Sequence, residues 1–433
     1  MKLSQIKILD KGIAIILTFL LMIPLTGCDS FISGEDDDPE QPFERRELPR
    51  ELSVEEKQLV DAGGYFGFNL MHKLLERAPD ESHFISPLSI LMAYGMTMNG
   101  AEGETYGQMQ VVFGLAGMSR GEINRAARDL FDLLITFDEQ VRFDIANSIW
   151  YRDTFHVEED FLQANQTFYD AVVEPADFDD PETVDRINQW VYDKTEGLID
   201  EIVEGPIDPL VVMYLINAIY FNGDWTIQFD PGKTELKPFY RPDHSSVDVD
   251  MMRMEEKEEM RYASGENYEA VNLFYGDAGY AMTLVLPDEE TGLKQWLAGM
   301  SWSDWASLTD GFQPATLTLE VPKFELEYEV DEFREILEEM GIVDAFYEDL
   351  SDFSRMNPYR EDLHISDTRH KSFIRVDEEG TEAAAVTSVE MSIESAPIPV
   401  HIRFDRPFFY VIREVESNTI LFMGTMTDPA KTE

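Results

Sequence analysis

Hydrophobic and polar residues recur with two different periods along the chain, and each period predicts a different kind of element. From about residue 52 the apolar positions are spaced close to three and four residues apart, which is typical of an amphipathic helix. These positions are Val54, Leu59, Phe66, Leu70 and Leu74. A second helix is expected to begin at Ser86 and Pro87, because serine caps a helix and proline fits its first turn.

Runs of apolar and β-favouring residues predict strands over 143–151, 211–221, 281–286, 316–324 and 408–413. Residues 210–220 are almost all apolar, which is typical of a strand buried on both faces. Residues 316–321 alternate, which favours a strand with one face in solvent. Helices and strands mix without a regular βαβα order, so we predict one large α+β domain over residues 51–433.

The segment 378–399 has an unusual pattern. Every second residue from Thr381 is small or apolar, and the residues between are mostly polar, as in a strand with one buried face. Gly380 precedes the alternation and Pro397 and Pro399 follow it, and these residues are typical of loops. Small residues in its first half suit insertion between existing strands. The pattern alone favours an ordinary strand, or a loop that alternates by chance.

Composition and charge exclude several classes of function. The chain has 433 residues, of which 44% are hydrophobic and 12% aromatic, as in folded globular proteins. Acidic residues outnumber basic ones by 86 to 34, and the resulting net charge of −52 repels phosphate backbones. Nucleic acid is therefore not expected as a partner. The seven histidines show no metal-binding spacing, so neither a metal site nor a cofactor is predicted.

One serine, Ser119, lies in a motif typical of hydrolases but is also spaced as a helix cap. Residues 117–121 match the G-x-S-x-G pattern that surrounds the nucleophilic serine of α/β-hydrolases. A loop precedes the motif instead of a core strand. Ser119 stands three residues before Glu122 at the head of a helical stretch, which is the spacing of a capping box. We therefore predict that Ser119 caps a helix.

The first residues have the pattern of an export signal. Lys2, Lys7 and Lys11 precede an apolar stretch, residues 12–25, that is short for a membrane span. Residues 25–28 read Leu-Thr-Gly-Cys, which resembles the lipobox of bacterial lipoproteins, and Cys28 is the only cysteine. The alternatives are an uncleaved signal anchor and a plain secretory peptide.

The lipoprotein interpretation predicts three parts of the N-terminal region. They are a signal peptide over 1–27, a lipid on Cys28, and a flexible acidic tether over 28–50. The protein is then expected in the cell envelope, held to a membrane by its lipid. Whether it faces the periplasm or the cell surface stays open.

Five motifs in a fixed order resemble those of the serpins, across about residues 52–429. They begin at Phe84 (Phe-Ile-Ser-Pro-Leu-Ser-Ile), Asn217 (Asn-Ala-Ile-Tyr-Phe-Asn-Gly-Asp-Trp), Glu378 (Glu-Glu-Gly-Thr-Glu-Ala-Ala-Ala), Phe404 (Phe-Asp-Arg-Pro-Phe-Phe) and Ile420 (Ile-Leu-Phe-Met-Gly). The resemblance implies an α+β fold with a large mixed sheet, smaller sheets, eight or nine helices and an exposed reactive-centre loop near the C-terminus.

The resemblance also implies a function. Inhibitory serpins are not enzymes: a target protease cleaves their loop, forms an acyl-enzyme with it, and is trapped when the loop inserts into the main sheet. The expected partners are a serine protease, with cysteine proteases as further targets, and the expected state is a monomer. The alternative is a non-inhibitory serpin that acts as a binding or chaperone module. Non-inhibitory serpins usually have a degraded hinge sequence, whereas the hinge sequence of this chain is intact.

The resemblance assigns roles to three groups of residues. The hinge, where insertion begins, is Glu378, Gly380, Thr381, Glu382, Ala383, Ala384 and Ala385. The shutter, a polar group beneath the parting strands, is Ser86, Ser89, Asn217 and His370. The breach, at the insertion point, contains Trp225 and Lys323. Lys323 is expected either to pair with Glu378 or to remain, like it, a solvated surface charge.

The bond that the protease cleaves depends on how the loop is counted. Counting from the hinge places it between Glu394 and Ser395. Counting back from Phe404 places it before a proline, where cleavage is poor. Met391–Ser392 and Ile393–Glu394 remain open as alternatives. Glu394 suits a glutamyl endopeptidase, whereas Met391 suits chymotrypsin- or elastase-like enzymes.

Overall fold

Three β-sheets organise the chain in the computed structural model, which describes residues 45–255, 260–381 and 400–431. These residues form one unit that starts at Arg45, ahead of the domain boundary predicted at residue 51. Nine helices accompany the sheets within these ranges. The predicted α+β fold, with a large mixed sheet and eight or nine helices, is confirmed.

The main sheet has six strands, and one of them is only two residues long. Their order is β12 (Phe324–Glu329), β13 (Lys371–Val376), β14 (Gly380–Thr381), β4 (Met213–Asp224), β2 (Val141–Arg152) and β3 (Val172–Ala176). β2 and β4 form a long antiparallel ladder, and β3 joins β2 in parallel. β14 lies between β13 and β4 and is antiparallel to both.

Two further sheets complete the framework. The seven-stranded sheet has the order β1 (His83–Ile85), β17 (Ile420–Met426), β16 (Phe408–Glu414), β9 (Tyr280–Pro287), β8 (Tyr268–Tyr275), β7 (Met260–Ser264) and β10 (Gln313–Ala315). The four-stranded sheet has the order β15 (Val400–Arg403), β11 (Leu317–Pro322), β6 (Ser246–Glu255) and β5 (Glu235–Tyr240). β15 follows the predicted loop and pairs with β11 in parallel.

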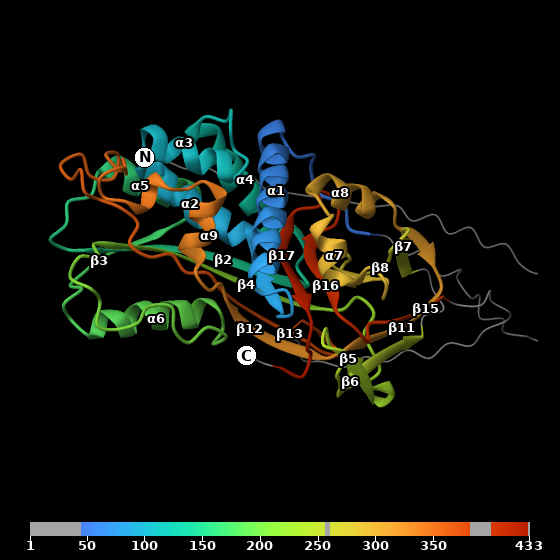
Figure 1. Cartoon of the computed structure of the whole chain (residues 1–433). Helices are drawn as coiled ribbons and strands as arrows, with labels where there is room; N and C mark the ends of the chain where they lie inside the picture. Colours follow the sequence, from blue (N-terminus) through green and yellow to red (C-terminus); the bar gives the residue numbers. More distant parts are fainter. Residues whose placement is uncertain (1–44, 256–259, 382–399, 432–433) are drawn as a thin grey trace, which may run out of the picture. The chain divides into compact units, whose positions relative to one another are not determined.

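Helices cover both faces of the main sheet (Figure 1). The nine helices are α1 (Val54–Arg77), α2 (Pro87–Gly100), α3 (Gly103–Val112), α4 (Arg120–Phe137), α5 (Glu159–Tyr169), α6 (Glu182–Lys194), α7 (Gly292–Ala298), α8 (Trp302–Asp310) and α9 (Phe333–Met340). Helix α6 lies on one side of β2 and β4, and α1, α2 and α5 lie on the other. A small apolar cluster of its own joins α6 to the sheet.

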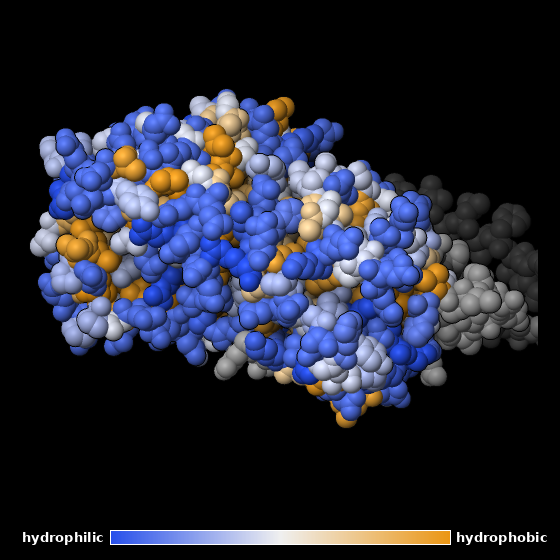
Figure 2. Space-filling view, in the orientation of Figure 1, coloured by the Kyte–Doolittle hydropathy of each residue, from blue (hydrophilic) through white to orange (hydrophobic). Residues whose placement is uncertain are grey.

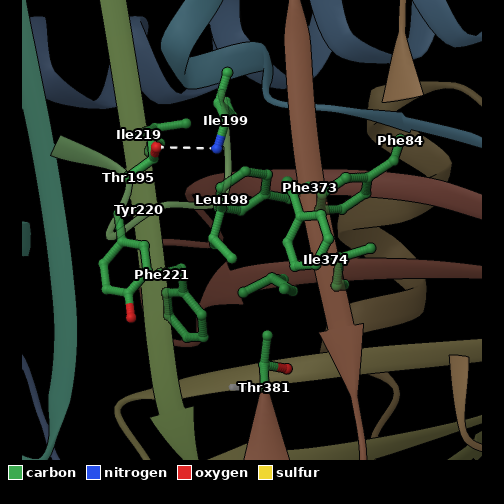
Figure 3. Close-up of a pocket in the computed structure, with 12 residues that line it drawn as sticks. Phe84, Thr195, Leu198, Ile199, Ile219, Tyr220, Phe221, Phe373, Ile374 and Thr381 are labelled. Carbon is green, nitrogen blue, oxygen red and sulfur yellow. Dashed lines mark hydrogen bonds between the residues drawn. The ribbon is translucent and has the colours of Figure 1, made fainter. Parts of the chain in front are cut away.

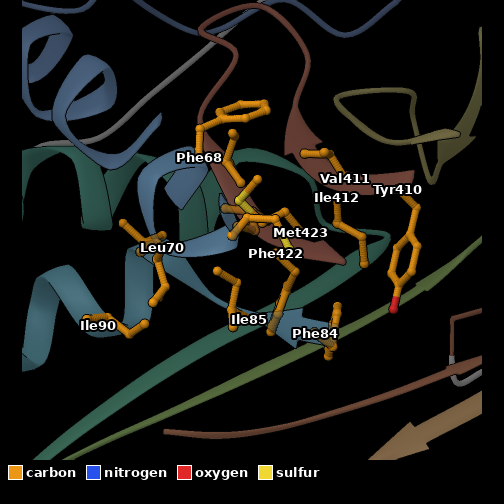
Figure 4. Packing of buried hydrophobic residues seen from close by; sticks show 14 of the residues in the cluster. Phe68, Leu70, Phe84, Ile85, Ile90, Tyr410, Val411, Ile412, Phe422 and Met423 are labelled. Carbon is orange, nitrogen blue, oxygen red and sulfur yellow. The ribbon is translucent and has the colours of Figure 1, made fainter. Parts of the chain in front are cut away.

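The main hydrophobic core lies where α1 and α2 meet the seven-stranded sheet. Figure 4 shows Phe68 and Leu70 of α1 packed near Phe422 and Met423 of β17. All residues of β16 and β17 are buried. Burying this much apolar surface is the dominant stabilising contribution to such a fold. The N-terminus of α2 is thereby fixed against β17, directly beneath the main sheet.

Three expectations about strands need correction. The run 316–324 is divided between β11 and β12, with Lys323 between them. Glu320 was expected on a solvent face of β11 but is fully buried, because basic side chains from neighbouring strands cover it. The apolar run 210–220 is not buried on both faces: Leu210 is 86% exposed, and Met213–Leu215 are half-buried.

Hydrophilic residues cover most of the face seen in Figure 2, as the high charge leads one to expect. Among the described residues, no helix is both long and apolar enough to cross a membrane.

Candidate functional site

The hinge begins with a tight turn between β13 and β14. The backbone N–H of Asp377 donates to the carbonyl of Gly380 at 3.1 Å, which reverses the chain. The Asp377 carboxylate accepts from the N–H groups of Glu379 and Gly380 at 2.9 and 3.3 Å. Aspartate is common in such turns because its side chain bonds the backbone two residues on. The turn sends Gly380 and Thr381 back into the main sheet beside β4.

Gly380 sits where no side chain fits. A Cβ atom built on it would lie 2.2 Å from the carbonyl oxygen of Gly223 and 2.8 Å from the Cα of Asp224. Both neighbours are backbone atoms of β4, so neither can rotate away. The glycine therefore permits the close approach that lets β14 pair with β4.

Thr381 places its side chain inside the protein. It is only 4% exposed, and its hydroxyl lies 2.7 Å from the hydroxyl of Tyr275. The Tyr275 ring stacks on Trp225, with centroids 4.5 Å apart and planes 20° apart. The Trp225 indole N–H donates to the carbonyl of Asp377 at 2.9 Å, and its backbone N–H to that of Glu379 at 2.8 Å. Trp225 thus holds the hinge turn through both its backbone and its side chain.

Glu378 and Lys323 form an ion pair in the structure, 2.7 Å between Oε2 and Nζ. The Thr234 hydroxyl donates to the other carboxylate oxygen of Glu378 at 2.6 Å. Burial by itself raises the pKa of Glu378, but these two hydrogen bonds, a backbone hydrogen bond and the positive charge of Lys323 together hold the pKa below its ordinary value. Of the two arrangements expected for this pair, the structure contains the paired one.

The four predicted shutter residues lie in one hydrogen-bonded group. Ser86 Oγ donates to the carbonyl of Leu421 in β17 at 2.7 Å and accepts from the N–H of Ser89 at 3.1 Å. The Ser86 N–H donates to Nε2 of His370 at 3.0 Å. The Ser89 hydroxyl donates to Oδ1 of Asn217. The group therefore joins α2 to β4, to β17 and to the residue preceding β13.

His370 is neutral in this arrangement. Its side chain is buried beside the N-terminus of α2, and burial lowers its pKa from 6.5 to about 4. Nε2 accepts the Ser86 N–H, so the ring proton of the neutral form is assigned to Nδ1.

A slot separates β4 from β13 beyond Thr381. Among the described residues, β13 and β4 are joined in the sheet only through the two residues of β14. Figure 3 shows side chains of both strands facing a small pocket there, with Thr381 at one end. Its lining from the two strands is Ile219, Tyr220, Phe221, Phe373 and Ile374.

A larger cavity continues from the slot toward the start of β4. Its volume is about 590 Å³, and its lining includes Ser89, Asn217 and His370 of the shutter. The half-burial of the start of β4 follows from this cavity, since the strand has no paired neighbour on that edge among the described residues.

Comparison with known proteins decides the family. A family model described as Serpin (serine protease inhibitor) matches residues 61–429. The chain belongs to the serpin family. Human Serpin B8 is 33% identical to this serpin over 378 residues, covering 86% of this chain and 99% of the relative. Human neuroserpin is 31% identical over 372 residues, covering 83% and 89% of the two chains.

Solved structures agree with this assignment. The thermophilic serpin tengpin in its native state superposes with a TM-score of 0.78 at 32% identity, covering 89% of this serpin and 97% of that chain. Human thyroxine-binding globulin in complex with thyroxine also gives 0.78, at 28% identity, covering 88% and 100% of the two chains. The predicted serpin fold is confirmed. The matched family is described as one of serine protease inhibitors, and this serpin is not an enzyme.

Several predicted site residues lie outside the described ranges. They are Cys28, the hinge residues Glu382, Ala383, Ala384 and Ala385, the bond residues Glu394 and Ser395, and the alternatives Met391 and Ser392. Their assignments stay predictions.

The position of Ser119 contradicts the hydrolase alternative. Its hydroxyl accepts from the N–H of Glu122, and the Glu122 carboxylate accepts from the N–H of Ser119 at 2.7 Å. This is a complete capping box at the start of α4, so the predicted cap is confirmed. The described residues contain no group of three His, Cys, Asp or Glu side chains placed to hold a metal.

Three side chains in these contacts were not predicted from the sequence. The side-chain amide of Asn217 donates to Oδ1 of Asn147 in β2 at 2.8 Å, so Asn147 extends the shutter. Tyr275 contacts Thr381, and Thr234 contacts Glu378. For Asn147 a signal existed, because a polar residue interrupts an apolar strand pattern. Tyr275 and Thr234 meet the hinge only through tertiary folding, for which one sequence carries no signal.

Proposed function

We propose that this serpin inhibits serine-type endopeptidases as a suicide substrate. The hinge is the observation that carries the proposal. Gly380 and Thr381 already pair with β4, and they lie at the end of a slot bordered by two strands that do not pair directly within the described residues. A loop that continues from Thr381 is therefore positioned to extend β14 along this slot.

The chemistry begins with the protease. Its serine oxygen attacks the carbonyl carbon of Glu394, the bond to Ser395 breaks, and the new amino group of Ser395 takes up the proton delivered by the protease histidine. The loop segment that ends at Glu394 is then held to the protease by an ester. Water would normally hydrolyse this ester and release the protease.

Insertion competes with that hydrolysis. Each residue added to β14 advances the loop by about 3.3 Å, so roughly thirteen residues carry the attached protease on the order of 40 Å. Each added residue also gains ladder hydrogen bonds with β4 and β13. When insertion is faster than hydrolysis, the protease is displaced while its ester is intact, and its active site is distorted.

The residue before the cleaved bond selects the class of protease. Glu394 requires a pocket with basic or hydrogen-bonding groups, as in glutamyl endopeptidases. Cleavage at Met391 instead favours chymotrypsin- or elastase-like enzymes. We propose Glu394–Ser395 as the reactive bond, on the spacing from the hinge.

A panel of proteases tests the proposal. The purified chain is incubated with a glutamyl endopeptidase, chymotrypsin and elastase, and the products are separated on denaturing gels. We expect a covalent complex with at least one enzyme, and a released C-terminal peptide whose first residue is Ser395. A first residue of Ser392 would move the bond to Met391. Cleavage without any covalent complex would contradict inhibition and favour the binding-module alternative.

The variant Thr381→Arg is the matched control for this experiment. Thr381 is buried, so a charged side chain there opposes insertion. The variant should be cleaved at the same bond but form little covalent complex.

We also propose that a lipid on Cys28 holds this serpin to a bacterial membrane, with residues 1–27 removed and the acidic segment that follows acting as a tether. The support is the Leu-Thr-Gly-Cys pattern at residues 25–28 and the absence of any other cysteine from the sequence. A chain made in a lipoprotein-processing bacterium with an alkyne fatty acid should be labelled and remain in the membrane fraction. The Cys28→Ser variant should lose the label. An unlabelled wild-type chain would contradict the anchor.

A further inference from the structure

Tyr275, the last residue of β8, has a buried hydroxyl whose partner is the hinge. The side chain is 0% exposed, and burial raises the pKa of its hydroxyl, which therefore stays neutral. The hydroxyl meets that of Thr381 at 2.7 Å. A buried polar group that loses its hydrogen bond is destabilising. Withdrawing Thr381 from the sheet would leave the Tyr275 hydroxyl buried without this hydrogen bond.

The surroundings of Tyr275 fix the direction of that hydroxyl. The ring is stacked on Trp225 and meets Phe221 edge-on, with centroids 4.9 Å apart. A Cβ atom on Gly223 would lie 3.2 Å from the ring, so the glycine leaves the room that the ring needs. Gly223 is also the residue of β4 that pairs with Thr381. The ring thus reaches the hinge at the register of Thr381, the second residue of β14.

We infer that Tyr275 is a positioning residue for loop insertion: its hydroxyl holds Thr381 inside the main sheet before any protease acts. Insertion then starts from a strand whose first side chain is already in place. The inference rests on the proposed function, because it assigns Tyr275 a part in the competition between insertion and hydrolysis. It adds to the breach a residue that contacts neither the protease nor the cleaved bond.

Two single variants and their double variant test the contact. Tyr275→Phe and Thr381→Val each remove one hydroxyl while keeping the size of the side chain. Tyr410→Phe is the matched control, because Tyr410 is also fully buried and its hydroxyl has no hydrogen-bond partner among the described residues. The Tyr410→Phe variant therefore shows the effect of removing a buried tyrosine hydroxyl that makes no hydrogen bond to the described residues.

The first readout is amide hydrogen exchange of the uncleaved chain. The peptide that contains Gly380 and Thr381 should exchange about fivefold faster in Tyr275→Phe than in the wild type, as expected for the loss of one hydrogen bond. Tyr410→Phe should exchange at the wild-type rate. This readout requires no protease.

The second readout is the number of serpin molecules consumed for each protease trapped. It should rise in Tyr275→Phe and in Thr381→Val, since a less firmly seated hinge gives hydrolysis more time. The double variant should match the single variants, because the two hydroxyls act through one contact. A Tyr275→Phe chain that equals Tyr410→Phe in both readouts would overturn the inference, as would fully additive effects. A wild type that traps no protease would contradict the proposed function, and the exchange comparison would still decide the role of Tyr275.

Discussion

His370 carries a charge that depends on the fold, which makes it a test of the shutter at the scale of one residue. The folded chain keeps the ring neutral, with a pKa of about 4, whereas the unfolded chain binds a proton near pH 6.5. Between these two values the unfolded chain binds more protons, so stability falls as the pH falls. The loss from pH 6.5 to pH 4 is about 3 kcal/mol.

The variant His370→Gln should remove this part of the pH dependence. A glutamine side-chain oxygen can accept the Ser86 N–H without taking up a proton. Urea unfolding at pH 7.5 and pH 5.0 should show a smaller difference in midpoint for the variant than for the wild type. The matched control is His156→Gln, since His156 is exposed. Equal pH dependence in wild type and His370→Gln would contradict a neutral buried ring.

Single residues of the site were predictable where the resemblance to the family assigns them a role. Ser86, Asn217, Trp225 and Glu378 belong to segments that resemble the family pattern, and the structure places them around the slot. Tyr275 lies in no such segment, and its contact with Thr381 depends on how the end of β8 meets the chain that follows β4. The contacts of a single tyrosine follow from packing, which periodicity does not encode.

At the scale of elements, Glu320 ties together all four strands of the smaller sheet. It lies in β11, is fully buried, and accepts from Lys237 of β5 at 3.0 Å and Arg253 of β6 at 3.3 Å. Arg403 of β15 also donates to it, and His401 lies 3.6 Å away. Burial by itself raises the pKa of Glu320, but the hydrogen bonds and the positive charges of Arg403 and Lys237 together hold the pKa below its ordinary value.

Glu320→Gln should therefore destabilise the protein strongly. The substitution keeps the size of the side chain but leaves three cations around a neutral amide, and breaking a buried pair typically costs about 3–5 kcal/mol. Glu327→Gln is the control, because that side chain is 45% exposed and pairs with Lys371 alone among the ion pairs of the described residues. The control should change the free energy of unfolding by about 1 kcal/mol or less. If the two variants change the free energy of unfolding in urea equally, Glu320 does not join the four strands.

The elements themselves show what periodicity can and cannot predict. Helices α1 and α2 begin near the expected residues, because Ser53 and Ser86 form side-chain caps that are local in sequence. The burial of β4 and of Glu320 was not predictable, since each depends on a neighbour distant in sequence. β4 borders a cavity on one edge, and Glu320 is covered by cations from three other strands.

At the scale of the whole molecule, the described residues leave β13 and β4 without direct pairing in the main sheet. Between β13 and β4 the described residues supply only Gly380 and Thr381, and the cavity beyond them is about 590 Å³. A strand added between β13 and β4 would gain ladder hydrogen bonds with both neighbours. A chain able to fill the slot thus gains free energy by doing so.

Cleavage of the loop should therefore stabilise the protein. A loop cut near Glu394 is free to extend β14, and a new ladder of about ten hydrogen bonds should raise the melting temperature by about 10 °C or more. The measurement is a thermal melt of the chain before and after limited cleavage, with Thr381→Arg treated in the same way. The variant should gain much less, because its charged side chain opposes burial at the first inserted position. A wild type that melts at the same temperature before and after cleavage would show that filling the slot releases no free energy, and the mechanism of trapping would lose its driving force.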